Sequence, residues 1–304
     1  MLTLEDLSDL AKTYRVDLES APSCQVSIGN HTIGQPNDYS LMGVINLSAD
    51  SWYRESVCLS VDQALQRARL LHNQGAQIID LGAESTVLNA ERVSASKQRE
   101  KLITLIKKMA TEGLTVSTET YHPSVARQAL KAGAKVINLT SGAHNKIFYE
   151  LARDHGAAVI ICFVAGKNVR EVKTISIDSD PIPALKKYFS KQLELVDKVG
   201  LEQVILDPGL GFYYRNLQDS AVRVRYQMAT FLHSFRLKEL GAPLCQALPH
   251  AFEFFGEEVR VAESFFAVLA ALGKCDLYRT HEVAKVRAVL ETLKTWNSPG
   301  RIQP

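Results

Sequence analysis

Short β-branched runs recur along this chain, and each follows a glycine that ends a stretch of helical length. Two examples are 75–80 (GAQIID) and 133–138 (GAKVIN). Glycine directly after a helix adopts the left-handed conformation that closes the helix. Because the runs are continuously apolar, they are typical of strands covered on both faces. Seven glycines stand at such places: Gly75, Gly113, Gly133, Gly156, Gly200, Gly241 and Gly273.

An eighth run, 41–46 (LMGVIN), comes before these seven, and a helix-length segment follows every run. The segments are roughly 60–75, 96–112, 122–132, 145–155, 183–199, 217–240, 256–272 and 282–296. Strict alternation of strand and helix predicts an α/β fold, a (β/α)8 TIM barrel with a parallel sheet. A doubly wound open sheet also alternates, but it usually has a glycine-rich turn after its first strand, where this chain has 46–51 (NLSADS).

Three parts of the chain are expected: an N-terminal helical extension, the barrel domain and a frayed tail, at 1–24, 25–297 and 298–304. Leu4, Leu7 and Leu10 have helical spacing after Thr3, a residue type that caps helices. At the start of the barrel domain, a hairpin around Gly29-Asn30 is expected to close the barrel floor. The charged segment 164–182 is expected to form a long mobile loop.

Composition narrows the class of protein. The chain has 304 residues, of which 46% are hydrophobic and 22% charged, as in globular proteins with a full core. The formal net charge of +2 gives no reason to expect nucleic-acid or membrane-surface binding. Its apolar runs are too short to span a membrane, no secretory signal is visible, and the five cysteines form no CxxC motif. We therefore expect a cytoplasmic protein.

Polar side chains stand at the ends of nearly all the predicted strands. In a parallel barrel, the C-terminal strand ends face the active site. A single Asp or Asn at such a place is often only a helix N-cap, but recurrence at most strand ends favours a common site. These residues are Asn46, Asp80, Glu119, Asn138, Cys162, Asp207, His250, Arg279 and His281.

The segments around these residues resemble the signatures of the dihydropteroate synthase family, a pterin-binding fold. In chain order they are 41–51 (LMGVINLSADS), 78–86 (IIDLGAEST), 117–121 (STETY), 137–142 (INLTSG), 206–212 (LDPGLGF) and 279–283 (RTHEV). The resemblance extends from about residue 25 to residue 293. It implies a transferase of folate biosynthesis that joins p-aminobenzoate to a dihydropterin pyrophosphate and releases pyrophosphate.

The resemblance assigns five residues to the pterin: Glu119, Asn138, Asp207, Phe212 and His250. The edge of a pterin carries an amino group and ring N–H donors beside acceptors. Carboxylates accept N–H bonds, and an Asn amide both donates and accepts. The side chains of Glu119, Asn138 and Asp207 therefore suit that edge.

The resemblance also implies an anion-binding side. Ser85 and Thr86, together with Arg279 and His281, would contact p-aminobenzoate or the pyrophosphate. Asn46 would hold Mg2+, an ion that prefers oxygen ligands. Asn46, Arg279 and His281 are thus the expected catalytic residues, because they would stabilise the departing charge.

Several positions differ from the family pattern. Glu119 replaces the family's Asp, and Val87-Leu88 replaces an Arg-Pro pair after Ser-Thr. The Ser-Arg-Lys-Ser segment becomes 248–251 (LPHA), so that His250 stands nearest to the missing pterin-contacting Lys. A His carries full charge only below about pH 6.5, so the replacement weakens the positive charge there.

The first loop also differs, with Ala49 in place of Pro and 52–54 (WYR) in place of Phe-Ser-Asp. Arg54 is a candidate to replace the missing Arg. Three other loop cations, Lys167, Arg170 and Lys173, are expected to be solvated.

Two other functions compete with the synthase. A pterin-binding paralogue with weakened or altered catalysis is favoured by Val87, Glu119 and the replacement at His250. A methyltransferase barrel that uses a reduced folate would not explain 84–86 (EST) or 279–281 (RTH). A homodimer that pairs through outer helices is implied by the resemblance alone.

Overall fold

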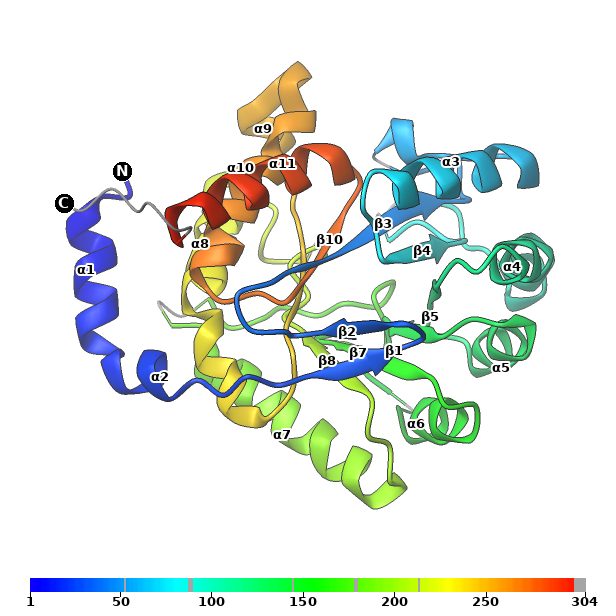
Figure 1. Cartoon of the computed structure of the whole chain (residues 1–304), viewed down its shortest axis with the longest axis horizontal. Helices are drawn as coiled ribbons and strands as arrows, with labels where there is room; N and C mark the ends of the chain where they lie inside the picture. Colours follow the sequence, from blue (N-terminus) through cyan, green and yellow to red (C-terminus); the bar gives the residue numbers. More distant parts are fainter. Residues whose placement is uncertain (52, 87–89, 144, 178–179, 213, 298–304) are drawn as a thin grey trace.

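Eight parallel strands alternate with helices and form the central sheet in this computed structural model (Figure 1). The structure describes residues 1–51, 53–86, 90–143, 145–177, 180–212 and 214–297. The strands are β3 (Ser40–Asn46), β4 (Ile78–Gly82), β5 (Val116–Thr120), β6 (Val136–Leu139), β7 (Ala158–Cys162), β8 (Val204–Asp207), β9 (Cys245–Ala247) and β10 (Leu277–Thr280). The eight apolar runs expected from the sequence are thereby matched strand by strand.

The strand order β8-β7-β6-β5-β4-β3-β10-β9 leaves only the junction between β8 and β9 without a continuous ladder. There a single parallel bridge joins Leu206 to Leu244, and the Leu206 N–H donates to the Pro243 carbonyl at 2.9 Å. The sheet thus curls into a nearly closed barrel. The predicted (β/α)8 fold is confirmed.

Helices cover the outside of the barrel (Figure 1). The main ones are α3 (Val61–Asn73), α4 (Ala95–Thr111), α5 (Pro123–Ala132), α6 (Asn145–Asp154), α7 (Ile182–Val199), α8 (Ser220–His233), α10 (Val259–Leu272) and α11 (Val283–Lys294). Gly133 closes α5 with φ 113°, which is the left-handed cap that the sequence predicts. Within the described residues, no helix combines the length and apolar character needed to cross a bilayer.

Shorter helices interrupt two of the predicted segments. The segment 217–240 divides into α8 and the 3-10 helix η2 (Ser234–Leu240). Before α10 lie α9 (Phe252–Phe255) and η3 (Gly256–Glu258), and η1 (Arg54–Ser56) and η4 (Thr295–Asn297) complete the set. η1, α9 and η3 lie in connections from a strand to the next outer helix, whereas η2 and η4 continue from the ends of α8 and α11.

A hairpin of β1 (Val26–Ile28) and β2 (His31–Ile33) lies across the barrel strands in Figure 1. Its apolar residues Val26, Ile28 and Ile33 share one core cluster with Met42 and Ile160 of the barrel strands. The hairpin turns at Gly29, whose φ is 58°. The expected plug at the N-terminal ends of the strands is therefore present.

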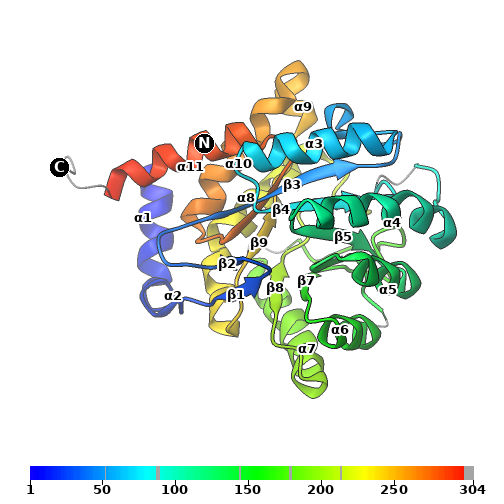
Figure 2. The same ribbon diagram turned by 45° about the vertical axis from the view of Figure 1, so that its right-hand side comes forward.

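The N-terminal extension forms two helices, α1 (Leu4–Thr13) and α2 (Arg15–Ser20), where one was expected. Thr3 caps α1, and Asp6 reciprocates in a capping box. The break falls at Tyr14, whose φ of −112° and ψ of 33° are not helical. In Figures 1 and 2, α1 lies outside the barrel on the side of α8 and the end of α11.

The loop between β7 and α7 carries no helix or strand in its described part. Isolated bridges nevertheless pair Gly166 with Val172 and Ser141 with Asn168. Arg170 is buried in this loop, with 3% of its side chain exposed. The expectation that Arg170 is solvated is therefore wrong, because the loop folds back over the barrel mouth and carries the guanidinium inwards.

Candidate active site

One cavity opens at the C-terminal ends of the barrel strands, where the polar strand ends were expected to meet. All ten predicted site residues line it: Asn46, Ser85, Thr86, Glu119, Asn138, Asp207, Phe212, His250, Arg279 and His281. They come from segments more than 230 positions apart in the chain, which shows that closure of the barrel brings them together. Their individual roles stay predictions.

A charged network fixes Arg279 at the centre of the cavity. Its Nε donates to Asp80 Oδ2 at 2.8 Å, and its Nη2 donates to Glu119 Oε2 at 2.6 Å. Asp80 is fully buried and also accepts from Ser117 Oγ at 2.6 Å and Asn138 Nδ2 at 3.0 Å. The guanidinium therefore pairs with two carboxylates, a contact that the predicted phosphate role did not include.

The amide of Asn138 and the carboxylate of Asp207 are held in fixed orientations. Asn138 Oδ1 accepts from Cys162 Sγ at 3.2 Å, while Asp207 Oδ1 accepts the Gly209 N–H at 2.7 Å. Gly209 has φ 75°, and a Cβ there would lie 2.3 Å from the Phe163 carbonyl oxygen. Only glycine fits this turn, which aims its N–H at Asp207.

Burial sets the protonation of two of these carboxyl groups. It raises the pKa of Glu119 to about 7, although Arg279 lowers it. It also raises the pKa of Asp207 to about 6, against the hydrogen bond from the Gly209 N–H. Both groups thus titrate near neutrality, where a ligand that donates N–H bonds would favour their charged forms.

Asn46 and Glu119 present oxygens to a common space beside Gly82. Asn46 Nδ2 donates to Ser56 Oγ at 2.6 Å, which orients the amide. A Cβ on Gly82 would lie 3.6 Å from Asn46 Oδ1 and 3.8 Å from Glu119 Oε2. Asn46 Oδ1, with room left by the glycine, fits the preference of Mg2+ for oxygen ligands, whereas Glu119 Oε2 already accepts from Arg279 Nη2 at 2.6 Å.

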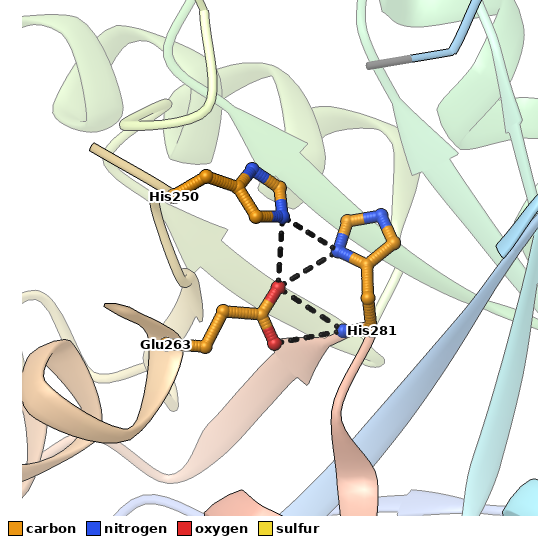
Figure 3. A group of neighbouring side chains, drawn as sticks. All are labelled: His250, Glu263 and His281. Atoms are coloured by element: carbon orange, nitrogen blue, oxygen red, sulfur yellow. Dashed lines mark hydrogen bonds and ion pairs between the residues drawn. The ribbon is translucent and has the colours of Figure 1, made fainter. Parts of the chain in front are cut away.

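The two histidines meet a carboxylate that the sequence pattern did not single out (Figure 3). Glu263 of α10 is fully buried, and its Oε1 lies 3.1 Å from His250 Nε2 and 2.8 Å from His281 Nδ1. The sequence does contain a sign of this residue. Glu263 is a carboxylate at i, i+3, i+4 spacing with Phe266 and Ala267, so it shares the apolar face of its helix.

Electrostatics within this group favour an ionised carboxylate. Burial alone would raise the pKa of Glu263, but hydrogen bonds from His250 and His281 bring it well below its usual range. Burial lowers the pKa of His281, although Glu263 opposes this shift. Tyr53 stacks on both rings, with centroids 4.9 Å from His250 and 4.7 Å from His281.

Arg170 holds the loop that carries Ser85 and Thr86. Its Nη1 donates to the Ser85 carbonyl at 2.9 Å, and its Nε lies 3.7 Å from Glu84 Oε1. Val87 and Leu88, where the family has Arg-Pro, lie outside the described residues. Arg54 is exposed on η1 and does not line the cavity, so its proposed compensating role has no support here.

Positive charge is scarce in this cavity. Among the described lining residues, Arg223 and Arg279 are the arginines, and there is no lysine. Arg223 Nη2 pairs with Glu253 Oε1 at 2.6 Å, just as Arg279 pairs with its two carboxylates. An anionic ligand would therefore meet cations that are already partly neutralised.

Comparison with known proteins agrees with this geometry. The sequence profile of the family described as "Pterin binding enzyme" matches residues 42–281. A dihydropteroate synthase of a Synechocystis species is 32% identical over 256 residues, which cover 80% of this chain and 85% of that protein. The dihydropteroate synthase of Bacillus subtilis is 28% identical over 276 residues, covering 86% and 90%.

Solved structures share the fold. A Xanthomonas albilineans dihydropteroate synthase with 4-aminobenzoic acid has a TM-score of 0.76 at 22% identity, covering 91% of this chain and 99% of that one. A Thermus thermophilus dihydropteroate synthase in complex with 4-aminobenzoate has a TM-score of 0.72 at 24% identity, covering 89% and 99%.

The chain is a parallel barrel whose mouth carries carboxylates, an amide and an arginine, and the family profile matches most of it. The chain therefore belongs to the pterin-binding enzyme family. The two relatives described above are dihydropteroate synthases, and the chain is a divergent, dihydropteroate synthase-like transferase.

Proposed function

We propose that this chain condenses a dihydropterin pyrophosphate with p-aminobenzoate and releases pyrophosphate, a step of folate biosynthesis. The observation that carries the proposal is the convergence of Glu119, Asn138 and Asp207 on one cavity at the mouth of a pterin-binding barrel. Carboxylate and amide groups complement the amino and ring N–H donors of a pterin edge.

In the reaction, the C–O bond between the pterin methylene and pyrophosphate breaks, and the bonding electrons leave with pyrophosphate. The aniline nitrogen of p-aminobenzoate attacks the methylene and then loses a proton. No covalent nucleophile is needed, since catalysis comes from positioning and charge stabilisation. His281 stands beside Asn46, with Nε2 3.5 Å from Asn46 Nδ2, and the two would face the departing pyrophosphate.

Mg2+ belongs to this proposal as a cofactor held by Asn46 Oδ1, with Glu119 Oε2 close to the same space. The ion would neutralise negative charge on the pyrophosphate. Ser85 and Thr86 line the cavity, next to the buried Arg170, and would contact the p-aminobenzoate. We also expect a homodimer and a cytoplasmic location for the enzyme.

Pyrophosphate release tests the proposal. The wild-type chain, given dihydropterin pyrophosphate, Mg2+ and p-aminobenzoate, should release pyrophosphate only when both substrates are present. Asp207→Ala should lower kcat/KM by roughly 100-fold, because it removes a charge-assisted hydrogen bond in a buried site. Lys191→Ala, on the exposed face of α7, is the matched control and should change nothing.

A pterin-binding protein without turnover is the second candidate function. It is favoured by the pairing of Arg279 with Asp80 and Glu119 and by the lack of lysine among the described lining residues. Calorimetric binding of the pterin with no pyrophosphate release would select it. Failure to bind the pterin at all would contradict both functions.

A further inference from the structure

His250, Glu263 and His281 converge on one another at the barrel mouth (Figure 3). The three atoms His250 Nε2, Glu263 Oε1 and His281 Nδ1 form a triangle with sides of 3.1, 2.8 and 3.2 Å. A metal ion about 2.1 Å from each of three ligands holds them roughly 2.9 to 3.4 Å apart, according to octahedral or tetrahedral geometry. The triangle is therefore already the size of one face of a coordination sphere.

We propose that these three side chains bind a divalent transition-metal ion of the Zn2+ class at the barrel mouth, with an open coordination position towards the cavity. Two imidazoles and one carboxylate are a donor set that such ions take, whereas Mg2+ prefers oxygen ligands. The site is thus chemically distinct from the Mg2+ position at Asn46. His250 and His281 both line the cavity, so a bound ion would lie at its wall.

The carboxylate is oriented before any ion arrives. Glu263 Oε2 accepts the His281 N–H at 2.9 Å, the Glu282 N–H at 3.1 Å and the Thr280 hydroxyl. Oε1 faces both imidazole nitrogens and also lies 3.2 Å from the His281 backbone nitrogen. Metal sites commonly have such supporting hydrogen bonds, which fix the first ligands in place.

The imidazole planes are supported as well. Tyr53 stacks on His250 at an interplanar angle of 23° and on His281 at 30°. Its hydroxyl donates to Glu282, which in turn pairs with Arg260, whose Nε lies 2.7 Å from Oε1. One aromatic ring therefore packs against both imidazoles.

Charge supplies an independent argument. Glu263 is fully buried, and in the described part of the chain its ion pairs are with the two imidazoles alone. A buried carboxylate is stabilised by hydrogen bonds and by nearby positive charge, and the hydrogen bonds to Oε2 come from groups without a formal charge. A divalent ion would neutralise it and leave positive charge facing a cavity whose described lining has no lysine. The further role of this charge, to bind pyrophosphate, rests on the proposed function; the metal site does not.

Metal binding is tested directly on the full chain after treatment with a chelator. Zn2+ titration, with bound metal counted by plasma mass spectrometry, should give one equivalent. Co2+ should give the visible absorption of a site with nitrogen and oxygen ligands. His250→Ala should weaken Zn2+ binding by at least about 100-fold, because it removes one of three protein ligands. His31→Ala, at the opposite end of the barrel, is the matched control and should bind as the wild type does.

Circular dichroism of His250→Ala separates loss of a ligand from loss of fold, and Glu263→Gln provides a second variant. Less than stoichiometric Zn2+ on the folded wild type, or equal affinity in His250→Ala, would overturn the site. Zn2+ binding without pyrophosphate release would contradict the proposed function but not the metal site. Pyrophosphate release without Zn2+ binding would contradict the metal site but not the proposed function.

His250→Lys tests the role of the metal charge. This variant should lose Zn2+ but keep pyrophosphate affinity within about threefold, because a lysine supplies the positive charge directly. His250→Ala should lose both. Equal loss of pyrophosphate affinity in the two variants would contradict the charge role.

Discussion

Arg279 illustrates at the residue scale how buried neighbours decide what a side chain can do. The pattern RTH at the end of the last strand predicted a guanidinium that grips phosphate oxygens. In the fold, Asp80 and Glu119 both accept from it, at 2.8 and 2.6 Å. Arg279 therefore neutralises and positions the carboxylates of the cavity, and any phosphate contact has to share it.

Removing this guanidinium should destabilise the fold. We expect Arg279→Ala to lower the free energy of unfolding by about 3–5 kcal/mol, because two buried carboxylates lose their partner. Urea denaturation measures the change. Arg69→Ala is the control, since Arg69 pairs with Glu112 on the surface, with 54% of its side chain exposed, and should cost less than about 1 kcal/mol. Similar losses in both variants would contradict this account.

Pterin affinity should depend on the protonation of Asp207 and Glu119. Burial raises their pKa values to about 6 and about 7, so below pH 6 both carboxyl groups are mostly protonated. A protonated carboxyl loses acceptor capacity for the pterin N–H donors. Affinity measured by calorimetry should therefore rise from pH 5 to pH 7.5, and Asp207→Asn should flatten the rise. A pH-independent affinity in the wild type would count against these two groups as the pterin acceptors.

At the scale of elements, the junction from β9 into α9 determines where His250 points. Ala251 follows His250 and precedes α9 with φ 45° and ψ 50°, a left-handed conformation that is uncommon for residues other than glycine. The chain accepts this strain at the segment where the family's Ser-Arg-Lys-Ser has become Leu-Pro-His-Ala. The turn places His250 Nε2 3.2 Å from Nδ1 of His281, the residue that follows β10.

Glycine should relieve that strain. We expect Ala251→Gly to raise the free energy of unfolding by about 0.5–1 kcal/mol, because glycine adopts positive φ without the Cβ penalty. Ala288→Gly, at an exposed position inside α11, should instead lower it by about 1 kcal/mol. Thermal and urea unfolding measure the free energy of unfolding of both variants. A loss of stability in both variants would show that Ala251 is not strained.

At the scale of the whole molecule, the barrel concentrates carboxyl groups at one mouth, and this affects stability as pH changes. In the folded chain, the pKa values of Glu119 and Asp207 are raised above their ordinary values of 4.5 and 3.8. Their contribution to stability is therefore fully present below about pH 4 and is lost as pH rises through about 6 to 7.

We expect the Glu119→Gln variant to show less loss of stability between pH 5 and pH 7.5 than the wild type. Gln cannot ionise, so the unfavourable burial of a charge disappears from that interval. Unfolding free energies at several pH values test this. An identical pH slope in the two proteins would contradict the assigned shift, and Glu112→Gln, on the surface, serves as the control.

The chain's own sequence determined the architecture. Glycines that close helices, continuous apolar runs and polar strand ends are local or periodic features, and they predicted eight strands, the hairpin plug and a common mouth for Glu119, Asn138 and Asp207. These predictions hold because backbone conformation and burial depend mainly on nearby residues and on periodicity.

Only the tertiary structure decided which side chains pair. It buried Arg170, engaged Arg279 with Asp80 and Glu119, and placed Glu263 of α10 between two histidines. Such partners come from elements far apart in the chain, and angstrom-scale distances select among them. No spacing along the sequence encodes those distances, because they arise only when the barrel closes.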